Sequence, residues 1–383
     1  MTLALLVIAS LCLLLAAHPF VTYPCSLILL RAVREWRPAS AGRVEPQPTF
    51  AICMCAYNEE AVIEAKLRNL LALRQRHPQL QLLVYVDAST DATAAILERH
   101  RGQIELHVSP RRQGKTFGMN LLASLATADV LIFTDANVML DRDCVSDLAR
   151  YFRDPEVGCV CGNLTYTNAD ASVTAATGAG YWRFEQTVKR LETETGSTLM
   201  ADGSIFAVRR HLHRVAPDDI IDDMYVSLIV LIEGYRIVQA QDVRAYEASA
   251  TDAKEEFGRK VRIACQAFNV HRLLWPWLRR LDALTRYKYV SHKLLRWLSI
   301  YFLGVAICAL IGALISAGHT FLALLAIALL LAGAALGYWT SLPPFAQIVD
   351  LLLALAATGI GVWRSLRGDR FQTWTPASSV RRA

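Results

Sequence analysis

Four groups of charged residues follow one another along the middle of the chain, and each is of a type that can do chemistry. They are Asp87, Asp135-Ala136-Asn137, Asp222-Asp223 and Arg259-Lys260-Val261-Arg262. A carboxylate after a parallel strand can accept hydrogen bonds from a nucleotide, and Mg²⁺ is held by one or two carboxylates together with substrate phosphates. A carboxylate can also act as a general base, and arginine binds phosphate through two parallel hydrogen bonds.

The first two groups also have ordinary structural interpretations. Asp87 could cap the helix predicted over residues 88–97, but Asp91 already suits that position, so a nucleotide contact is favoured. Asp135 and Asn137 could form a capped turn, but the apolar stretch 131–133 before them favours a metal site. Because Asn137 is neutral and the poorer ligand, the metal would depend on Asp135 and on the phosphates of its substrate.

The last two groups are more ambiguous. Adjacent carboxylates repel, which raises one pKa, whereas a helix N-terminus stabilises the anion. Asp223 could therefore be an ionised general base oriented by Asp222, and simple capping of the helix beginning at Met224 is equally compatible. Arg259 and Arg262, three residues apart, would face one way on a helix and could bind a diphosphate. The alternative is a pair of cations at a membrane surface.

The elements that would position these groups alternate between strand and helix. Strands are predicted at 50–55, 82–86, 104–108, 130–133 and 158–161, and helices at 59–74, 88–97, 115–126, 144–152, 181–191 and 223–233. This alternation predicts an α/β domain with a mostly parallel, doubly wound sheet. Ligands of such sheets bind beyond the carboxyl ends of the strands, where Asp87 and Asp135 both fall. Residues 254–290 could form a helix in the membrane interface or one packed on the domain.

Apolar segments lie on both sides of this domain. The chain has 383 residues and is 54% hydrophobic; residues 3–30 are almost uncharged, and further apolar runs cover 294–315, 319–339 and 344–363. About 20 apolar residues span a bilayer. No charge precedes the first run, which favours a membrane anchor over a cleaved signal peptide. Arg31, Arg34 and Arg37 follow it and place that end on the inside.

The basic tail raises a question of topology. Arg364, Arg367, Arg370, Arg381 and Arg382 favour the same side as the domain, but three apolar runs separate the two. Either one run lies in the interface or re-enters, or the tail is outside. The Pro343-Pro344 start makes the last run the candidate for an interfacial helix.

Net charge and cysteines exclude other classes. The charge of +6 is dispersed and fits an anionic lipid surface better than nucleic acid. Cys53 with Cys55 and Cys159 with Cys161 are expected on strands as core residues, since no second pair provides zinc-ligand spacing.

Taken in order, the motifs resemble those of the membrane-bound family 2 glycosyltransferases, which include cellulose, chitin and hyaluronan synthases and bacterial exopolysaccharide enzymes. The matching segments are 56–60 (Ala-Tyr-Asn-Glu-Glu), 86–91 (Val-Asp-Ala-Ser-Thr-Asp), 114–120, 133–137, 201–203 with Arg209 and Arg210, 222–223 and 259–262. They cover most of residues 50–270.

The resemblance implies a GT-A fold and inverting transfer of a sugar from a nucleotide-sugar donor, usually a UDP-sugar. It implies nucleotide contacts from Tyr57, Glu59, Asp87 and Lys115, Mg²⁺ or Mn²⁺ at Asp135 and Asn137, Asp223 as the base, and Asp202 and Gly203 at the acceptor. Arg259 and Arg262 would steady the departing diphosphate. The expected location is the bacterial inner membrane with a cytoplasmic catalytic domain.

On this basis the chain divides into an anchor (1–37), a GT-A domain (44–253), an Arg-x-x-Arg segment with interfacial helices (254–293), transmembrane segments (294–363) and a basic tail (364–383). The expected acceptor is a growing polysaccharide; single-sugar transfer to a lipid and a non-catalytic membrane scaffold are the alternatives. A second copy or an export partner is also compatible. The usual Gln-x-x-Arg-Trp of processive synthases reads Arg-Lys-Val-Arg-Ile here, so processivity stays open.

Overall fold

The computed structural model describes residues 1–33, 47–168, 171, 173–248, 251–340 and 344–374. An eight-stranded sheet forms the centre of the domain, in the order β3-β2-β1-β4-β7-β6-β8-β5. The strands are β1 (Phe50–Ala56), β2 (Gln81–Asp87), β3 (Glu105–Ser109), β4 (Val130–Asp135), β5 (Met139–Leu140), β6 (Val157–Tyr166), β7 (Ile205–Arg209) and β8 (Arg236–Glu247). Some residues used in the topology prediction lie outside the described residues: Arg34, Arg37, Pro343, Arg381 and Arg382.

The first four strands of the sheet are parallel, as the alternating pattern predicts. β1 pairs in parallel with β2 and β4, and β2 with β3. Every residue of β1 is buried, which explains its continuous apolar sequence. Beyond β4 the sheet changes direction, because β7 pairs antiparallel with both β4 and β6. The turn at residues 201–204 leads directly into β7, so it lies beside the carboxyl end of β4.

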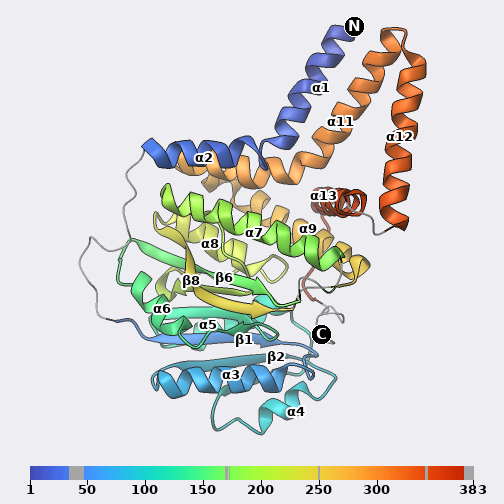
Figure 1. Cartoon of the computed structure of the whole chain (residues 1–383). Coiled ribbons are helices and arrows are strands. Elements are labelled where there is room, and N and C mark those ends of the chain that lie inside the picture. Colours follow the sequence, from blue (N-terminus) through green and yellow to red (C-terminus); the bar gives the residue numbers. More distant parts are fainter. Residues whose placement is uncertain (34–46, 169–170, 172, 249–250, 341–343, 375–383) are drawn as a thin grey trace.

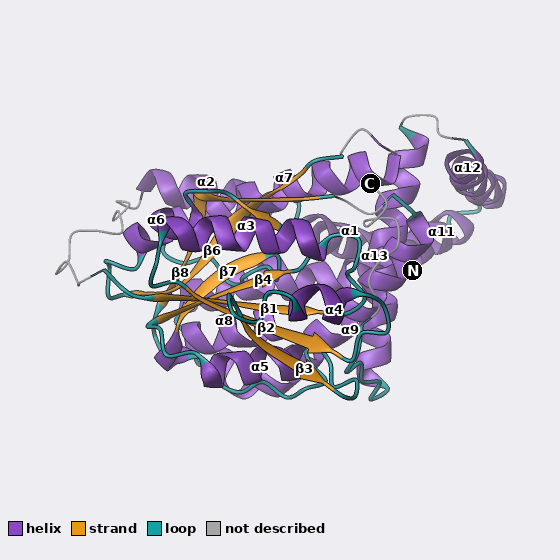
Figure 2. Ribbon diagram, turned by 90° about the horizontal axis from the view of Figure 1, so that it is seen from below, coloured by secondary structure: helices purple, strands orange, loops and turns teal. Residues whose placement is uncertain are grey.

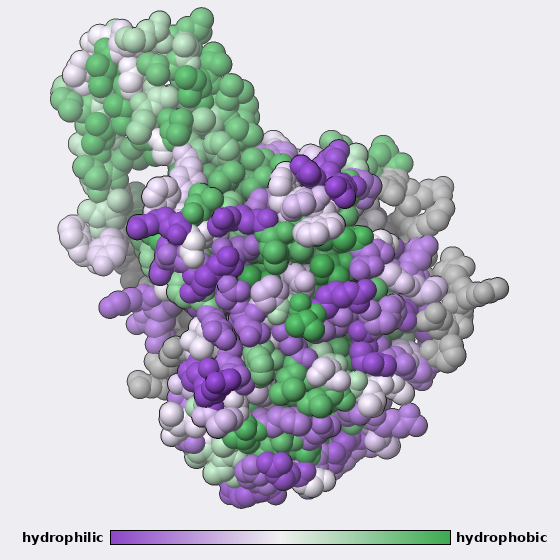
Figure 3. All heavy atoms as spheres, turned by 180° about the vertical axis from the view of Figure 1, so that it is seen from behind, coloured by the Kyte–Doolittle hydropathy of each residue, from purple (hydrophilic) through white to green (hydrophobic). Residues whose placement is uncertain are grey.

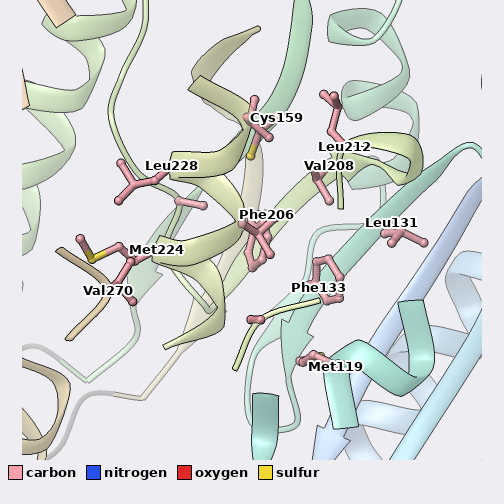
Figure 4. Packing of buried hydrophobic residues seen from close by; sticks show 14 of the residues in the cluster. Met119, Leu131, Phe133, Cys159, Phe206, Val208, Leu212, Met224, Leu228 and Val270 are labelled. Atoms are coloured by element: carbon pink, nitrogen blue, oxygen red, sulfur yellow. The ribbon is translucent and has the colours of Figure 1, made fainter. Parts of the chain in front are cut away.

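Helices cover both faces of the sheet (Figure 2). One apolar cluster includes α3 (Ile63–Arg76), α4 (Thr93–Glu98) and α6 (Cys144–Tyr151). The other includes α5 (Lys115–Leu125), α8 (Asp222–Ile232) and α9 (Ala253–Leu278). In the second cluster Phe133 of β4 stacks on Phe206 of β7 at 4.9 Å between ring centroids, and Met119 and Met224 lie nearby (Figure 4). This packing holds the end of β4 and the start of α8 in fixed positions.

Helices from both ends of the chain lie outside the domain and form the apolar part of the molecule (Figure 3). α1 (Thr2–Ala17) packs along α11 (Leu295–Ser316), and α12 (Thr320–Trp339) returns beside it (Figure 1). α1 and α2 (Thr22–Val33) meet at a 60° bend, and α2 lies over α7 (Val173–Glu194). Ala283–Ser316, Thr320–Trp339 and Phe345–Leu366 are long and apolar enough to cross a membrane, and α1 with α2 could add a fourth span.

The last apolar helix, α13 (Phe345–Leu366), lies across the direction of α11 and α12, since Figure 1 shows it end-on. It packs closely on α9: a Cβ on Gly361 would lie 2.6 Å from both the Ala264 Cβ and the Val261 carbonyl oxygen. Its exposed apolar residues, including Ile348, Leu352 and Trp363, recur at helical spacing along one face.

Some predicted boundaries were wrong. The helix expected from residue 59 begins at Ile63, because residues 59–62 form a turn after β1. Residues 254–290 pack on the domain, forming α9 and then α10 (Ala283–Tyr289), which a π-helical turn (Val290–Leu294) joins to α11. Tyr289 and Trp297 are buried against His271 of α9, which fits the second of the two alternatives, a helix packed on the domain.

Ala88 provides a test of the turn that follows β2. It has a φ of 52°, in the left-handed region that disfavours residues with a Cβ. We expect Ala88→Gly to raise the melting temperature of the full chain in detergent by about 1–3 °C, since relief of strain exceeds the entropic cost of glycine. Ala95→Gly, in the exposed face of α4, should lower it. A lower melting temperature for both variants would show that Ala88 is unstrained.

Candidate active site

Asp87, at the end of β2, is completely buried and organises the loop before α5. Its carboxylate accepts hydrogen bonds from the backbone of Gln113 (2.7 Å) and Gly114 (3.1 Å) and from Arg112 Nε (3.0 Å). The predicted helix-capping role belongs to Asp91, which accepts from the Thr93 backbone at 3.0 Å. Asp87 therefore shapes the loop that reaches the site, and any contact with a nucleotide adds to these bonds.

Arg112 is the most prominent site residue that the sequence interpretation missed. Its guanidinium lies 3.3 Å from the centroid of the Tyr57 ring and 5.5 Å from the Trp374 ring. The two rings are 5.9 Å apart at 70°. A nucleotide base can stack on an aromatic ring or on a planar guanidinium, and Tyr57 and Arg112 provide one of each. The signal in the sequence was the basic pair at 111–112 directly before Gly114-Lys115.

Residues 369–374, here called the C-terminal strap, pass from α13 over this loop. Gln372 Nε2 donates to the Gln113 carbonyl (3.1 Å), and Arg112 Nη2 donates to the Trp374 carbonyl (2.7 Å). On the other side, Gln266 of α9 donates to the Phe371 carbonyl at 2.7 Å. The strap thus connects α9 with the residues predicted to bind the nucleotide. It belongs to the segment 364–383, which the sequence indicated only as a basic tail.

Glu59 lies in the turn after β1 and is buried. Its backbone N–H donates to Thr93 Oγ1 at 2.8 Å, so this part of the motif links β1 to α4. Asn58 before it has a φ of 52° and bonds the backbone of Thr90. The two predicted nucleotide motifs, 56–60 and 86–91, therefore form one continuous rim.

Asp135 forms an ion pair with Lys115 across the carboxyl end of the sheet, with Lys115 Nζ 2.6 Å from Asp135 Oδ1. The sequence assigned these residues to different groups, metal and nucleotide. Burial opposes the charge of Lys115, but the carboxylates of Asp135, Asp222 and Asp223 raise its pKa above its usual range. One ammonium group therefore faces three carboxylates.

The second predicted metal ligand, Asn137, donates from Nδ2 to Glu247 Oε1 at 2.8 Å. Among the described residues no group of three His, Cys, Asp or Glu side chains could hold a metal ion. The available donors are hard oxygens, and the Oδ2 of buried Asp222 has no hydrogen-bond partner within the described ranges. This set fits a hard divalent ion that takes part of its coordination from a diphosphate.

Asp223 is half-buried and its Oδ1 accepts from the backbone of Met224 at 2.6 Å. Burial, Asp222 and Asp202 raise the pKa of Asp223 to about 7, although Lys115 lowers it. Capping and an acid–base role are therefore compatible in the same residue. A carboxylate with a pKa close to neutral is suited to exchange protons at physiological pH.

The predicted acceptor turn lies directly against these groups. A Cβ added to Gly203 would be 3.1 Å from Asp223 Oδ2 and 3.2 Å from Lys115 Nζ. Asp202, before it, is held by buried Lys189 of α7 at 2.5 Å. Any side chain at position 203 would therefore narrow the space beside Asp223.

The two predicted phosphate-binding arginines differ. Nε and Nη2 of Arg259 donate to the carboxylate of Glu256, at 2.8 and 3.0 Å, so Arg259 takes part in a local ion pair. Arg262 donates to Gln266 at 3.1 Å. Burial and Arg259 lower the pKa of Arg262 and Asp135 raises it, which places Arg262 within electrostatic range of Asp135. Arg262 is therefore the arginine nearer the acidic centre.

Comparison with known proteins identifies this arrangement. Residues 51–215 match the family model described as glycosyl transferase family 2. This part of the chain, rather less than half of it, is therefore similar to a family 2 glycosyltransferase domain. The matched residues contain Tyr57, Asp87, Lys115, Asp135 and Gly203, while α8 and the Arg-x-x-Arg segment follow them.

Curated relatives of this chain include enzymes that are named for N-acetylglucosamine. An N-acetylglucosaminyltransferase of Rhizobium meliloti (strain 1021) is 23% identical over 273 residues, which are 67% of this chain and 64% of the relative. The poly-beta-1,6-N-acetyl-D-glucosamine synthase of Staphylococcus aureus (strain COL) is 26% identical over 193 residues, 48% of this chain and 46% of the relative. The chain thus spans less than two-thirds of either relative's length.

A solved structure confirms the GT-A fold. The mannosyltransferase PcManGT from Pyrobaculum calidifontis, in complex with GDP-Man and Mn²⁺, has a TM-score of 0.73 to this chain. The match covers 95% of this chain and 99% of the other at 21% identity. The likeness therefore includes the apolar helices as well as the sheet.

The acid pair predicts a defined pH dependence for the glycosyltransferase. Below pH 7 Asp223 is increasingly protonated and cannot accept a proton, so transfer should fall on the acidic side. Asp222→Asn removes a like charge, which lowers the pKa of Asp223 and should move the acidic limb of the pH–kcat/KM profile down by about one unit. The profile is measured at saturating metal. An unmoved limb would show that Asp223 does not set it.

Proposed function

We propose that this glycosyltransferase transfers a sugar with inversion from a nucleotide-sugar, most simply a UDP-sugar, to a growing polysaccharide at the cytoplasmic face of the bacterial inner membrane. The observation that carries the proposal is the Lys115–Asp135 ion pair beside Asp222 and Asp223, at the carboxyl ends of the parallel strands. This arrangement places Lys115, which would bind phosphate, and Asp135, which would bind the metal ion, close to Asp223, which would act as the base. The name of one curated relative, a poly-beta-1,6-N-acetyl-D-glucosamine synthase, supports the polymeric product.

In the proposed reaction Asp223 takes the proton of the acceptor hydroxyl. The hydroxyl oxygen of the acceptor at the same time forms a bond to the anomeric carbon of the donor sugar. The bond from that carbon to the diphosphate breaks on the opposite side, and the diphosphate leaves with the electron pair. Lys115 and Arg262 stabilise the negative charge that develops there, where such groups contribute most. Gly203 and Asp202 leave room for the acceptor beside the base.

We further propose that Asp135, with Asn137, holds Mg²⁺ or Mn²⁺ together with the donor diphosphate. When bound, the ion neutralises charge on the leaving group. Lys115 would then donate to a phosphate oxygen, because it competes with the ion for the carboxylate of Asp135. Tyr57 and Arg112 receive the base, and Asp87 keeps the loop of Gln113 and Gly114 in place.

The proposed topology has α1, α11 and α12 crossing the membrane, with α13 lying along its surface. Two crossings, α11 and α12, then separate the domain from the tail, so both lie on one side. This removes the conflict between an odd number of apolar runs and a basic tail. The transverse position of α13 and its one apolar face support the arrangement (Figure 1). Arg31, paired with Glu194 of α7 at 2.8 Å, fits the same side.

Single-sugar transfer to a lipid acceptor is the second candidate. α12 is only 11% buried over its most apolar window, so α11 and α12 form a hairpin with an open apolar surface. A hairpin of this kind fits an acceptor that arrives through the bilayer as well as it fits an extruded polymer.

The test uses membranes that contain the full chain. Each of a panel of UDP-sugars is supplied with Mn²⁺, and released UDP and product length are measured. We expect release with one donor, its loss on adding EDTA, and a product of many sugar units. A product with a single added sugar would replace the polymer with the lipid acceptor. No UDP release with any donor would refute UDP-sugar use.

A further inference from the structure

Arg296 is the second residue of α11, and its side chain is turned towards the protein and 8% exposed. Its Nη1 donates to Tyr181 Oη at 2.8 Å and to Glu185. Its Nε and Nη2 are buried and have no hydrogen-bond partner among the described residues. These two nitrogens form one edge of the guanidinium, the edge that binds phosphate or carboxylate through two parallel bonds. Leaving such donors unpaired is costly, so the arrangement indicates a missing ligand.

The charges around this edge favour an anion. Glu185 is shared by Arg296, by Lys293 Nζ at 3.0 Å and by His292 Nε2 at 3.1 Å. One carboxylate thus faces two permanent cations, both nearly buried. The remaining nitrogen of His292 contacts Glu192 at 2.6 Å, and buried Lys288, whose Nζ donates to the Glu192 carbonyl at 2.7 Å, offsets the charge of the Glu192 carboxylate. A buried excess of positive charge is unfavourable unless an anion completes it.

The site lies at the depth where the proposed membrane ends. It borders the bend between α1 and α2, where His18 contacts Ser291 at 2.9 Å. Tyr287 and Tyr301, on either side of Arg296 in sequence, are 38% and 40% exposed, as expected of an aromatic belt at the headgroup level. The π-helical turn Val290–Leu294 directs His292 and Lys293 inwards just before α11, and such turns are common at functional sites.

Two aromatic rings lie close to the guanidinium of Arg296. The guanidinium lies 5.5 Å from the centroid of Phe20 and 5.7 Å from that of Tyr181. Tyr181 is 39% exposed, so rotation of this one side chain opens the edge to the membrane interface. Ring rotations of exposed side chains are fast and require no change of fold.

We propose that Arg296, with Lys293 and Glu185, forms a binding site for the phosphate group of an anionic membrane lipid. The proposal rests on the membrane placement proposed above, and it goes beyond the transfer reaction. Its ligand would join α11 to α7, the helix whose Lys189 holds Asp202 in the acceptor turn. Lipid bound here would therefore stabilise the acceptor side of the active site.

The test is native mass spectrometry of the full chain in detergent, titrated with phosphatidylglycerol or with phosphatidylcholine. We expect one phosphatidylglycerol to bind more tightly than phosphatidylcholine. Arg296→Lys keeps the charge but removes the two-donor edge, and should weaken that site about tenfold. Arg31→Lys, an exposed arginine on α2, is the matched control and should leave it unchanged. Melting temperature and UDP release, measured in parallel, report folding and glycosyl transfer separately.

Three results would overturn the proposal. Equal binding of the two lipids by the wild-type chain would exclude an anion-selective site, whether or not the variant folds. Equal losses in Arg31→Lys and Arg296→Lys would indicate a diffuse surface charge. Displacement of the lipid by millimolar inorganic phosphate would make the ligand a soluble anion. None of these depends on the donor, so lipid binding can persist even if the proposed sugar transfer fails.

Discussion

Asp223→Asn should reduce glycosyl transfer by about 10³-fold, within the range of 10²–10⁴ typical of a lost general base. Asparagine keeps the shape of the side chain and cannot accept the proton of the acceptor hydroxyl. The loss should fall on kcat, since donor binding is assigned to Tyr57, Lys115 and Asp135 and not to Asp223. Initial rates of UDP release at saturating donor and metal provide the measurement.

Asp218→Asn is the matched control, because Asp218 lies in the loop before α8 but has no contact assigned in the proposed chemistry. It should retain wild-type activity. Burial and the neighbouring carboxylates disfavour the ionised form of half-buried Asp223. The Asn variant should therefore be at least as stable towards unfolding as the wild type above pH 7. A stable Asp223→Asn protein that transfers within tenfold of the wild-type rate would remove Asp223 from the role of base.

The sequence could predict the rim of the site because the rule behind it is local. A buried parallel strand ends where its apolar run ends, and the carboxyl ends of neighbouring parallel strands meet at one edge. β2 and β4 both flank β1, so Asp87 and Asp135 had to lie at the same edge once the strands were identified. The same logic placed Lys115 at the start of α5, directly after the loop that Asp87 holds.

Other features depend on contacts between distant segments, for which no local pattern exists. The antiparallel β7 reverses the direction that alternation predicts, and only this reversal brings Gly203 beside Asp223. Trp374 reaches Tyr57 from more than 300 residues away, after the chain has returned from the membrane helices. Arg112 was overlooked for a related reason: a basic residue in a loop signals nothing until its aromatic partners are known.

The second large effect is expected for Lys115→Met. Lys115 is the cation shared by Asp135, Asp222 and Asp223, and in the proposed reaction it passes to the donor diphosphate. Loss of one preorganised donor to a developing negative charge costs about 10²–10³-fold in rate. We therefore expect kcat/KM for the donor to fall by that amount. The acidic limb should also move upwards, because Lys115 lowers the pKa of Asp223.

This upward shift is opposite in sign to that of Asp222→Asn, so the pair of variants tests one electrostatic centre from both sides. Lys115→Arg keeps the positive charge and should retain the position of the limb while losing part of the rate, since a guanidinium cannot reproduce the 2.6 Å ammonium contact with Asp135. Mn²⁺ affinity, followed by electron paramagnetic resonance without donor, should not fall in Lys115→Met, because the ammonium competes with the ion for Asp135. Weaker Mn²⁺ binding together with an unmoved limb would mean that Lys115 supports the fold of the cleft and takes no part in its chemistry.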